Sequence, residues 1–163
     1  MKRSDVIPEK ILTLPDAMQK VQQWRKQKKS IAFTNGVFDI IHPGHIFSIS
    51  QAANEADYLI VGLNSDKSVK NLKGDSRPVN HQDSRALVLA SLLLVDMVII
   101  FETTTPLELI QSILPDVLVK GGDYKPEDIA GYKEVIANGG KVVINPIIPG
   151  FSTTGIINSM KHL

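Results

Sequence analysis

The chain has 163 residues, 43% of them hydrophobic, which is enough for one domain with a continuous core. Its 18 lysines and arginines nearly balance 17 acids, so no overall field favours nucleic acid or an anionic membrane. The absence of cysteine excludes disulfides and thiolate metal sites. No apolar run reaches the roughly 18 residues that cross a bilayer, and the N-terminus lacks the apolar core of a signal peptide. We therefore expect a cytoplasmic protein.

Helical and strand patterns alternate along the chain. Thr13 is expected to cap the first helix, which has Pro15 in its first turn. The expected helices are Pro15–Lys28, Gly44–Glu55, Gln82–Leu94, Pro106–Leu114 and Thr153–Lys161. The expected strands are Ile31–Gly36, Tyr58–Asn64, Met97–Phe101, Asp116–Gly122 and Lys141–Asn145. The polar stretch Ser65–His81 is expected to be a long loop, and loops of this length inside a domain are often functional.

The composition of the strands predicts the fold class. They are continuous runs of valine, isoleucine and leucine, which indicate burial on both faces of a parallel sheet. Alternation with helices implies right-handed crossovers. We therefore predict an α/β fold, a Rossmann-like doubly wound sheet of five parallel strands with helices on both faces. Residues 30–163 would form the core of this single domain, and residues 1–29 an N-terminal helical extension.

Polar clusters follow the predicted strands. They are TNGVFDIIHPGH (Thr34–His45), the stretch that starts at Asn64, KGGDY (Lys120–Tyr124) and GFSTT (Gly150–Thr154). In doubly wound sheets, ligands bind beyond the carboxyl ends of the strands, where the strand order reverses. The four clusters are therefore predicted to converge on one site.

Two histidines form the most distinctive pattern. The chain contains neither GxGxxG nor GxxxxGK[ST], so a phosphate group would need a different cradle. His45 falls in the first turn of a predicted helix, and His42 lies just ahead of it, with Gly44 between them. Free N–H groups and the helix dipole favour an anion there, and imidazoles can donate to a phosphate. Two alternatives are a zinc site, for which only His81 and His162 remain as further imidazoles, and two plain surface histidines.

Three further groups of residues could bind phosphate. Ser152, Thr153 and Thr154 open the last predicted helix, although a plain N-cap needs only one hydroxyl. Lys120 supplies a cation beside two glycines that allow close backbone approach, or that simply turn the chain. The polar stretch and the following helix carry cations that could neutralise phosphates or form a solvated face: Lys67, Lys70, Lys73, Arg77 and Arg85.

These motifs resemble a known family. HPGH after TNGVFD resembles the HxGH signature of the nucleotidyltransferase superfamily, and STT resembles its C-terminal phosphate-binding motif. The segments TNGVFDIIHPGH, VGLNSDKSVKNLKGDSRPVN, DVLVKGGDY and STTGII are similar, in order and spacing, to D-glycero-β-D-manno-heptose 1-phosphate adenylyltransferases. The resemblance runs from about Ile31 to Met160. In that family the domain is often half of a bifunctional protein with a sugar kinase, and this chain resembles the stand-alone form.

The resemblance implies a reaction and its participants. AMP would pass from ATP to heptose 1-phosphate with Mg²⁺, giving ADP-heptose, a lipopolysaccharide core precursor, and pyrophosphate. The sugar phosphate would attack in line, without a covalent intermediate. The implied partners are a nucleoside triphosphate, a sugar 1-phosphate, a second copy of the chain in a homodimer, and a separate heptose kinase upstream. Nucleic acid and membrane are not implied.

The resemblance also assigns residues. His42, His45 and Lys73 would be catalytic, and no side chain is assigned to the metal. The residues expected to bind nucleotide are Thr34, Asn35, Gly36, Val37, Phe38, Asp39, Gly44, Asn64, Lys70, Arg77, Arg85, Lys120, Gly121, Gly122, Asp123, Ser152, Thr153 and Thr154. Independently of the resemblance, the length, polarity and cations of the 65–81 stretch predict that it acts as a mobile clamp on the triphosphate.

Two other functions compete with this one. In glycerol-3-phosphate cytidylyltransferases, cations fall where this chain has Leu93, Leu107 and Ile147, and apolar side chains cannot replace them. A non-catalytic nucleotide or sugar-phosphate binding module is the alternative of another class. The presence of both histidines favours the enzyme over this module.

Overall fold

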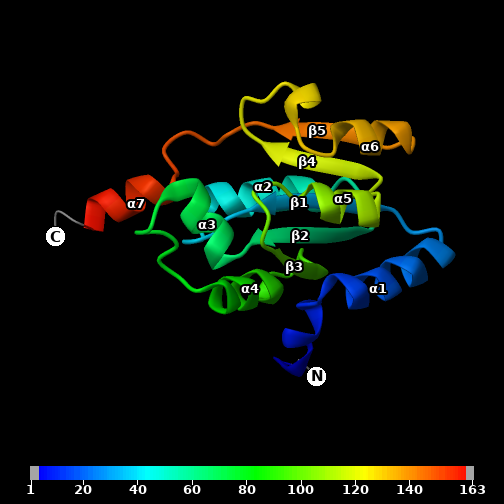
Figure 1. Cartoon of the computed structure of the whole chain (residues 1–163), viewed down its shortest axis with the longest axis horizontal. Helices are drawn as coiled ribbons and strands as arrows, with labels where there is room; N and C mark the ends of the chain where they lie inside the picture. Colours follow the sequence, from blue (N-terminus) through cyan, green and yellow to red (C-terminus); the bar gives the residue numbers. More distant parts are fainter. Residues whose placement is uncertain (1–3, 161–163) are drawn as a thin grey trace.

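The computed structural model describes residues 4–160, which form a sheet of five parallel strands in the order β3-β2-β1-β4-β5 (Figure 1). The strands are β1 (Ile31–Gly36), β2 (Tyr58–Asn64), β3 (Met97–Phe101), β4 (Val117–Gly121) and β5 (Lys141–Asn145). The strand order reverses between β1 and β4, as in other doubly wound sheets. The predicted α/β fold is confirmed.

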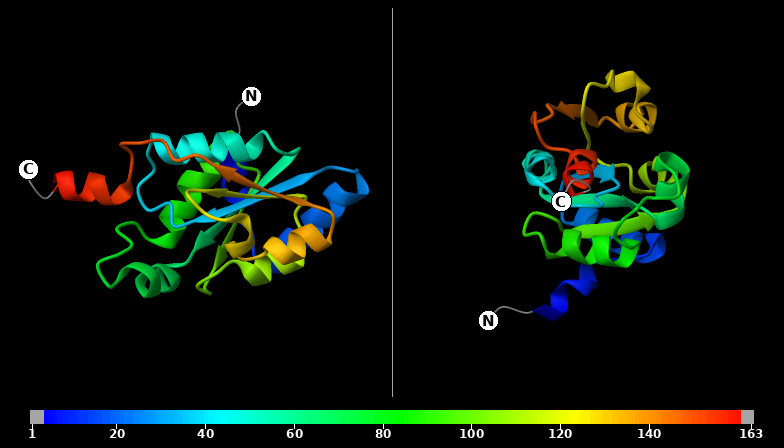
Figure 2. Two further views of the ribbon diagram at one scale, coloured as in Figure 1. Left: turned by 90° about the horizontal axis from the view of Figure 1, so that it is seen from above. Right: turned by 90° about the vertical axis from the view of Figure 1, so that its left-hand side faces the viewer.

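Helices cover both faces of the sheet (Figure 2). Their bounds are α1 (Leu14–Lys26), α2 (Pro43–Ala53), α3 (Asp66–Lys73), α4 (Gln82–Ser91), α5 (Leu107–Ile113), α6 (Tyr132–Ala137) and α7 (Thr153–Met160). Short 3₁₀ helices lie at Ser4–Val6, Pro8–Lys10 and Pro126–Asp128. Helices α1, α5 and α6 pack into one apolar cluster, and α2 and α4 into the other. Alternate strand residues divide between the clusters, with Ile31 and Phe33 in the first and Ala32 in the second.

The N-terminal helix α1 is part of the core. Thr13 accepts a hydrogen bond from the Asp16 amide as its N-cap, as expected. Ala17, Val21 and Trp24 recur on one face of the helix and are buried in the first cluster. The Trp24 ring also stacks on Tyr58 of β2, with 4.1 Å between the centroids. This helix therefore stabilises the sheet that carries the candidate site.

Strands β1 and β4 separate before they end. β1 pairs with β2 along its whole length, but its register with β4 covers only Ala32 with Val117 and Phe33 with Leu118. Beyond these pairs, the carboxyl ends of the two strands leave room for side chains from both. The sheet thus opens at the reversal of strand order, where the sequence predicted a ligand site.

The expected long loop at Ser65–His81 is wrong, because half of it is helix α3. Ser65 caps this helix by accepting from the Ser68 amide at 3.1 Å, and Ser68 and Val69 are buried. The sequence did carry signals of this helix, namely a serine N-cap, Asp66 in the first turn and lysines in the last turn, but its polar composition concealed them. Only residues 74–81 lie between α3 and α4.

Other differences concern element ends and short elements. Helix α1 ends at Lys26, α2 at Ala53 and α4 at Ser91, each two or three residues before the predicted end. Helix α6 and the 3₁₀ turns were not predicted. The predicted end of the last helix, Lys161, lies outside the described residues. Within residues 4–160, no helix has the length and apolar character needed to cross a bilayer.

Candidate active site

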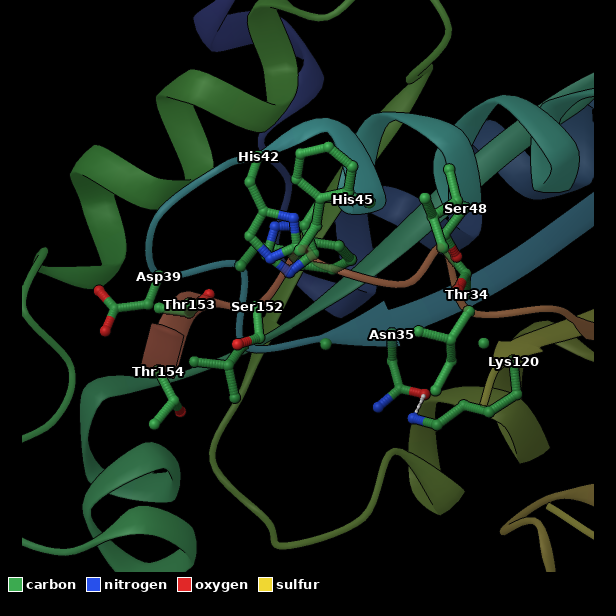
Figure 3. Close-up of a pocket in the computed structure, with 18 of the residues that line it drawn as sticks. Thr34, Asn35, Asp39, His42, His45, Ser48, Lys120, Ser152, Thr153 and Thr154 are labelled. Atoms are coloured by element: carbon green, nitrogen blue, oxygen red, sulfur yellow. Dashed lines mark hydrogen bonds between the residues drawn. The ribbon is translucent and has the colours of Figure 1, made fainter. Parts of the chain in front are cut away.

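A cavity of about 440 Å³ opens at the carboxyl ends of β1 and β4 (Figure 3). Its floor comes from these strands, and its walls come from the N-terminal ends of α2 and α7 and from the segment after α3. The lining residues are Thr34, Asn35, Gly36, Val37, Phe38, Asp39, His42, Gly44, His45, Ser48, Lys73, Arg77, Lys120, Gly121, Tyr124, Pro146, Ile147, Ile148, Phe151, Ser152, Thr153 and Thr154.

His42 and His45 form a stacked pair at the start of α2. His42 is the N-cap residue, with extended backbone, and its carbonyl accepts from the His45 amide at 2.9 Å. This turn places the two rings 3.8 Å apart and nearly parallel, while Phe38 packs edge-on against His45 at 5.2 Å. A Cβ atom at Gly44 would lie 3.1 Å from the His42 ring, so a larger residue there would press against the stack.

Burial makes both imidazoles neutral near pH 7. It lowers the pKa of His42, and it lowers the pKa of His45 to about 4, with a further contribution from the nearby His42. Among residues 4–160, the Nδ1 atoms of both rings are buried without a hydrogen-bond partner. Unsatisfied buried polar atoms are rare in proteins and are a feature of functional sites. The pair therefore has hydrogen-bonding capacity left for a ligand.

The start of α7 faces the same cavity. The Ser152 hydroxyl accepts from the Gly155 amide at 3.0 Å, and the Thr153 hydroxyl donates to the Ile40 carbonyl at 3.5 Å. Figure 3 shows Ser152, Thr153 and Thr154 near the histidine pair. Helix N-termini attract anions through free amides and the helix dipole. The histidines and these hydroxyls together suit an anion with several oxygens.

Lys120 is a half-buried cation at the other end of the cavity. Its ammonium group donates to the Asn35 amide oxygen at 3.2 Å across the gap between β4 and β1 (Figure 3), and lies 6.0 Å from the centroid of the Tyr124 ring. Burial lowers the pKa of Lys120. Of the described residues that line the cavity, only Asp39 bears a carboxylate, and that group is bonded elsewhere. The cavity is therefore rich in donors and poor in negative charge.

Asp39 binds the segment after α3. Its carboxylate accepts from Arg77 Nε at 2.8 Å and from the amides of Val79 and Asn80 at 2.9 Å. Burial alone would raise the pKa of Asp39, but the bonds from Asn80, Val79 and Arg77 outweigh it and hold the pKa below its usual value. Figure 3 shows the carboxylate pointing away from the histidines. Asp39 is thus ionised and satisfied within the protein.

Most of the residues predicted from the sequence line this cavity, but five do not: Asn64, Lys70, Arg85, Gly122 and Asp123. The Arg85 side chain is fully buried and donates to the carbonyls of Val37, Asn64 and Asn80 and to the Asp66 carboxylate. It has no surface left for a phosphate. Lys70 is exposed on α3. The five residues were predicted only from their charge or from the motif that contains them. Neither feature indicates where a side chain points.

Some lining residues were not predicted. They are Ser48, Tyr124, Pro146, Ile147, Ile148 and Phe151. Ser48 lies one helical turn after His45, so its helical spacing could have revealed it. Ile147, Ile148 and Phe151 lie just before the Ser152–Thr154 cluster and form an apolar wall. Phe151 and Tyr124 fall within the predicted GFSTT and KGGDY clusters, although neither was assigned a role, and no motif marked Pro146 or Ile148.

The described residues contain no group of three or more His, Cys, Asp or Glu side chains that could hold a metal ion. A magnesium ion at this cavity would lack a protein carboxylate, because Asp39 is bonded to the nearby segment. Magnesium is commonly bound through substrate phosphates and a few carboxylates. The donor set therefore does not fit an ion held mainly by side chains.

The chain is similar to several known proteins. It is 53% identical over 139 residues to the bifunctional protein HldE of Rhodopseudomonas palustris (strain TIE-1), covering 85% of this chain and 28% of that one. It is 52% identical over 152 residues to HldE of Shigella flexneri serotype 5b, covering 93% and 32%. The chain thus spans about a third of the length of these relatives.

Solved structures and a family comparison agree with the fold. A lipopolysaccharide core biosynthesis protein from Thermoplasma volcanium GSS1 matches with a TM-score of 0.60 and 23% identity, over 74% of this chain and 97% of that one. A pantoate-beta-alanine ligase from Francisella tularensis matches with a TM-score of 0.54 and 17% identity, over 88% and 75%. Residues 33–159 match the cytidylyltransferase-like family, a span that includes every part of the cavity. The chain belongs to the cytidylyltransferase-like family.

Proposed function

We propose that the chain is a nucleotidyltransferase that transfers AMP from ATP to D-glycero-β-D-manno-heptose 1-phosphate, releasing pyrophosphate and ADP-heptose. One observation carries the proposal: the His42–His45 pair, the start of α7, and two cations of the 73–77 stretch line one cavity at the reversal of strand order. More than 50% identity with HldE proteins over most of the chain supports the choice of substrates.

In the proposed reaction an oxygen of the sugar phosphate attacks the α-phosphorus of ATP. The bond from the α-phosphorus to the bridging oxygen breaks on the opposite side, and pyrophosphate leaves with that oxygen. No covalent intermediate forms, so the protein mainly positions the reactants and neutralises charge. His45 would donate to the oxygens that gain charge in the transition state, and His42 would bind the triphosphate.

The remaining parts of the cavity would bind the rest of the nucleotide. Ser152, Thr153 and Thr154 would hold the β- and γ-phosphates, and Lys73 and Arg77 would neutralise them. Lys120 and Asn35 would lie toward the nucleoside. Mg²⁺ would arrive as the counterion of ATP, and no step above depends on an ion held by side chains.

The proposal extends to partners and location. A separate heptose kinase would supply the sugar 1-phosphate, and the enzyme would act in the cytoplasm, where ATP is available. We also propose a homodimer. Apolar side chains exposed on α4 and in the turn after it, Leu87, Val88 and Leu93, would lose water contact in such an assembly.

The first test is the substrate pair. Pyrophosphate release should be fastest with ATP and heptose 1-phosphate among four nucleoside triphosphates and a set of sugar 1-phosphates and glycerol 3-phosphate. Ile147, where glycerol-3-phosphate cytidylyltransferases would have an arginine, presents an apolar side chain to the cavity. Faster turnover of CTP with glycerol 3-phosphate would reverse the assignment, and binding without any turnover would favour a non-catalytic module.

His45→Ala should lower kcat by about 10²- to 10³-fold, because it removes a donor to charge that develops in the transition state. His42→Ala should have a similar or smaller effect. His81→Ala is the matched control, since the His81 side chain is 90% exposed and lies outside the cavity. Steady-state kinetics with circular dichroism of each variant makes the comparison. A folded His45→Ala enzyme with normal kcat would exclude the role.

The role of His45 as a neutral donor predicts how stability depends on pH. An unfolded imidazole takes up a proton near its ordinary pKa of 6.5, whereas folded His45 stays neutral until about pH 4. Between these values the unfolded state binds more protons, so stability should fall as the pH is lowered from 6.5 to 4. Urea midpoints should decline less steeply for His45→Gln than for wild type, and His81→Gln should follow wild type. Equal slopes for His45→Gln and wild type would mean that His45 is not held neutral.

Lys73→Ala should raise KM for ATP and lower kcat, with a loss in kcat/KM of about 10- to 100-fold for one charged contact. Lys73 is exposed at the end of α3 and lines the cavity, so its removal should leave the melting temperature almost unchanged. Lys67→Ala on the same helix is the control, because Lys67 lies outside the cavity near Glu102. Equal kinetics for the two variants would show that Lys73 is only a solvated charge.

A further inference from the structure

We propose that Asp39 is a positioning residue, which holds the 74–81 segment and the guanidinium of Arg77 in place for the triphosphate. This inference rests on the proposed function, because it assumes that the charge to be bound is that of a nucleoside triphosphate. The buried Asp39 carboxylate would act on the nucleotide by orienting Arg77, without touching the nucleotide itself.

The first ground is the set of partners of Asp39. The side chain is fully buried, and all its partners are donors from one segment about 40 residues further along the chain: Arg77 Nε, the Val79 amide and the Asn80 amide. The Asn80 side chain also donates to the Asp39 main-chain carbonyl at 2.6 Å. One carboxylate thus binds two consecutive backbone amides and the Arg77 side chain of a segment that lies between two helices.

The second ground is the state of Arg77. Its side chain is 12% exposed and uses only Nε for Asp39, and its two terminal nitrogens have no hydrogen-bond partner among residues 4–160. A guanidinium is planar, so one bond at Nε restricts the orientation of the whole group. Arg77 lines the main cavity and also a smaller one between α3 and α7, together with Lys73 and Thr154. The free edge of Arg77 is therefore available to phosphate oxygens.

The third ground is a second anchor on the same segment. Arg85 donates to the Asn80 carbonyl at 2.9 Å and to the carbonyls of Val37 and Asn64 at 2.6 and 2.9 Å. Asp39 and Arg85 thus hold the end of the segment to the carboxyl ends of β1 and β2 through buried ions of opposite charge. Because the Arg77 side chain is held in place before the ligand arrives, binding does not have to order it. The smaller loss of conformational entropy favours affinity for the ligand.

The location of Asp39 links this segment to the histidines. Asp39 lies three residues before His42 and directly after Phe38, whose ring packs against His45. Loss of the Asp39 hydrogen bonds should therefore displace Arg77 first, and should disturb the transition-state donor His45 only to a smaller extent. This separates the proposed role from a catalytic one, which would act mainly on kcat.

The test is a double-mutant cycle on KM for ATP. Asp39→Asn keeps the size but turns an amide group toward three donors, and it should raise KM about tenfold or more, with a smaller change in kcat. Arg77→Ala should raise KM similarly, and the double variant should be no worse than Arg77→Ala alone. Additive effects, or an unchanged KM in Asp39→Asn, would overturn the proposal.

Asp116→Asn is the matched control. The Asp116 carboxylate likewise accepts from an arginine, Arg25, at 2.5 Å and from a backbone amide, that of Ile31, at 2.7 Å, but at the amino ends of the strands. This variant should lose stability and keep its KM for ATP. A raised KM in Asp116→Asn would mean that KM follows general destabilisation, and it would overturn the assignment.

A second variant covers the case in which Asp39→Asn does not fold. Arg77→Lys keeps the charge but lacks Nε, so its ammonium cannot bind Asp39 and reach the cavity at once. It should raise KM as Arg77→Ala does, and a normal KM would overturn the proposal.

Calorimetric binding of ATP separates this inference from the proposed function. If wild type binds ATP without transferring AMP, the proposed function fails. The inference is then tested by repeating the double-mutant cycle with the Kd for ATP in place of KM. If wild type turns over but the variants bind ATP normally, only the inference fails, and if wild type binds no ATP, both fail.

Discussion

The site depends on the separation of β1 from β4. β1 is hydrogen-bonded to β2 over its full length but keeps register with β4 at only two positions. Thr34, Asn35 and Gly36 therefore end beside an opening rather than beside a neighbouring strand. Lys120 and Asn35 bridge this opening with a single hydrogen bond, and helix α2 starts above it. A sheet that stayed paired to its end would fill the space in which the cavity lies.

Around this opening the protein has two kinds of ionisable side chain. Asp39 and Arg85 are buried and satisfied by protein groups, so they hold backbone segments together. His42 and His45 are only partly buried as residues, but their Nδ1 atoms are buried and lack a hydrogen-bond partner among residues 4–160. Burial without partners is costly in free energy, and it is tolerated at functional sites because a ligand can complete the hydrogen bonds. This contrast separates structural from ligand-binding roles better than residue type does.

The histidine pair illustrates how local rules create chemistry. The N-cap geometry of His42 and the turn that follows set the spacing of the two rings, and Gly44 leaves room for their stacking. The neutral state of His45 follows from its burial and from its neighbour His42. A neutral imidazole can donate a hydrogen bond without repelling the other cations at the cavity. The same pair would respond to the charge of a bound triphosphate.

The amino-acid sequence by itself determined the five-stranded parallel fold and most of the cavity, because buried strands and the motifs at their ends leave strong local patterns. It indicated His42, His45 and the hydroxyls at the start of α7 through their positions at helix starts. The tertiary structure alone decided the roles of charged residues whose motif or net charge looked alike. Arg77 lines the cavity and Arg85 is bonded to carbonyls, although the two arginines lie only eight positions apart in the sequence. It also decided that Asp39 faces Val79 and Asn80, since contacts between residues 40 positions apart depend on packing, which no local pattern encodes.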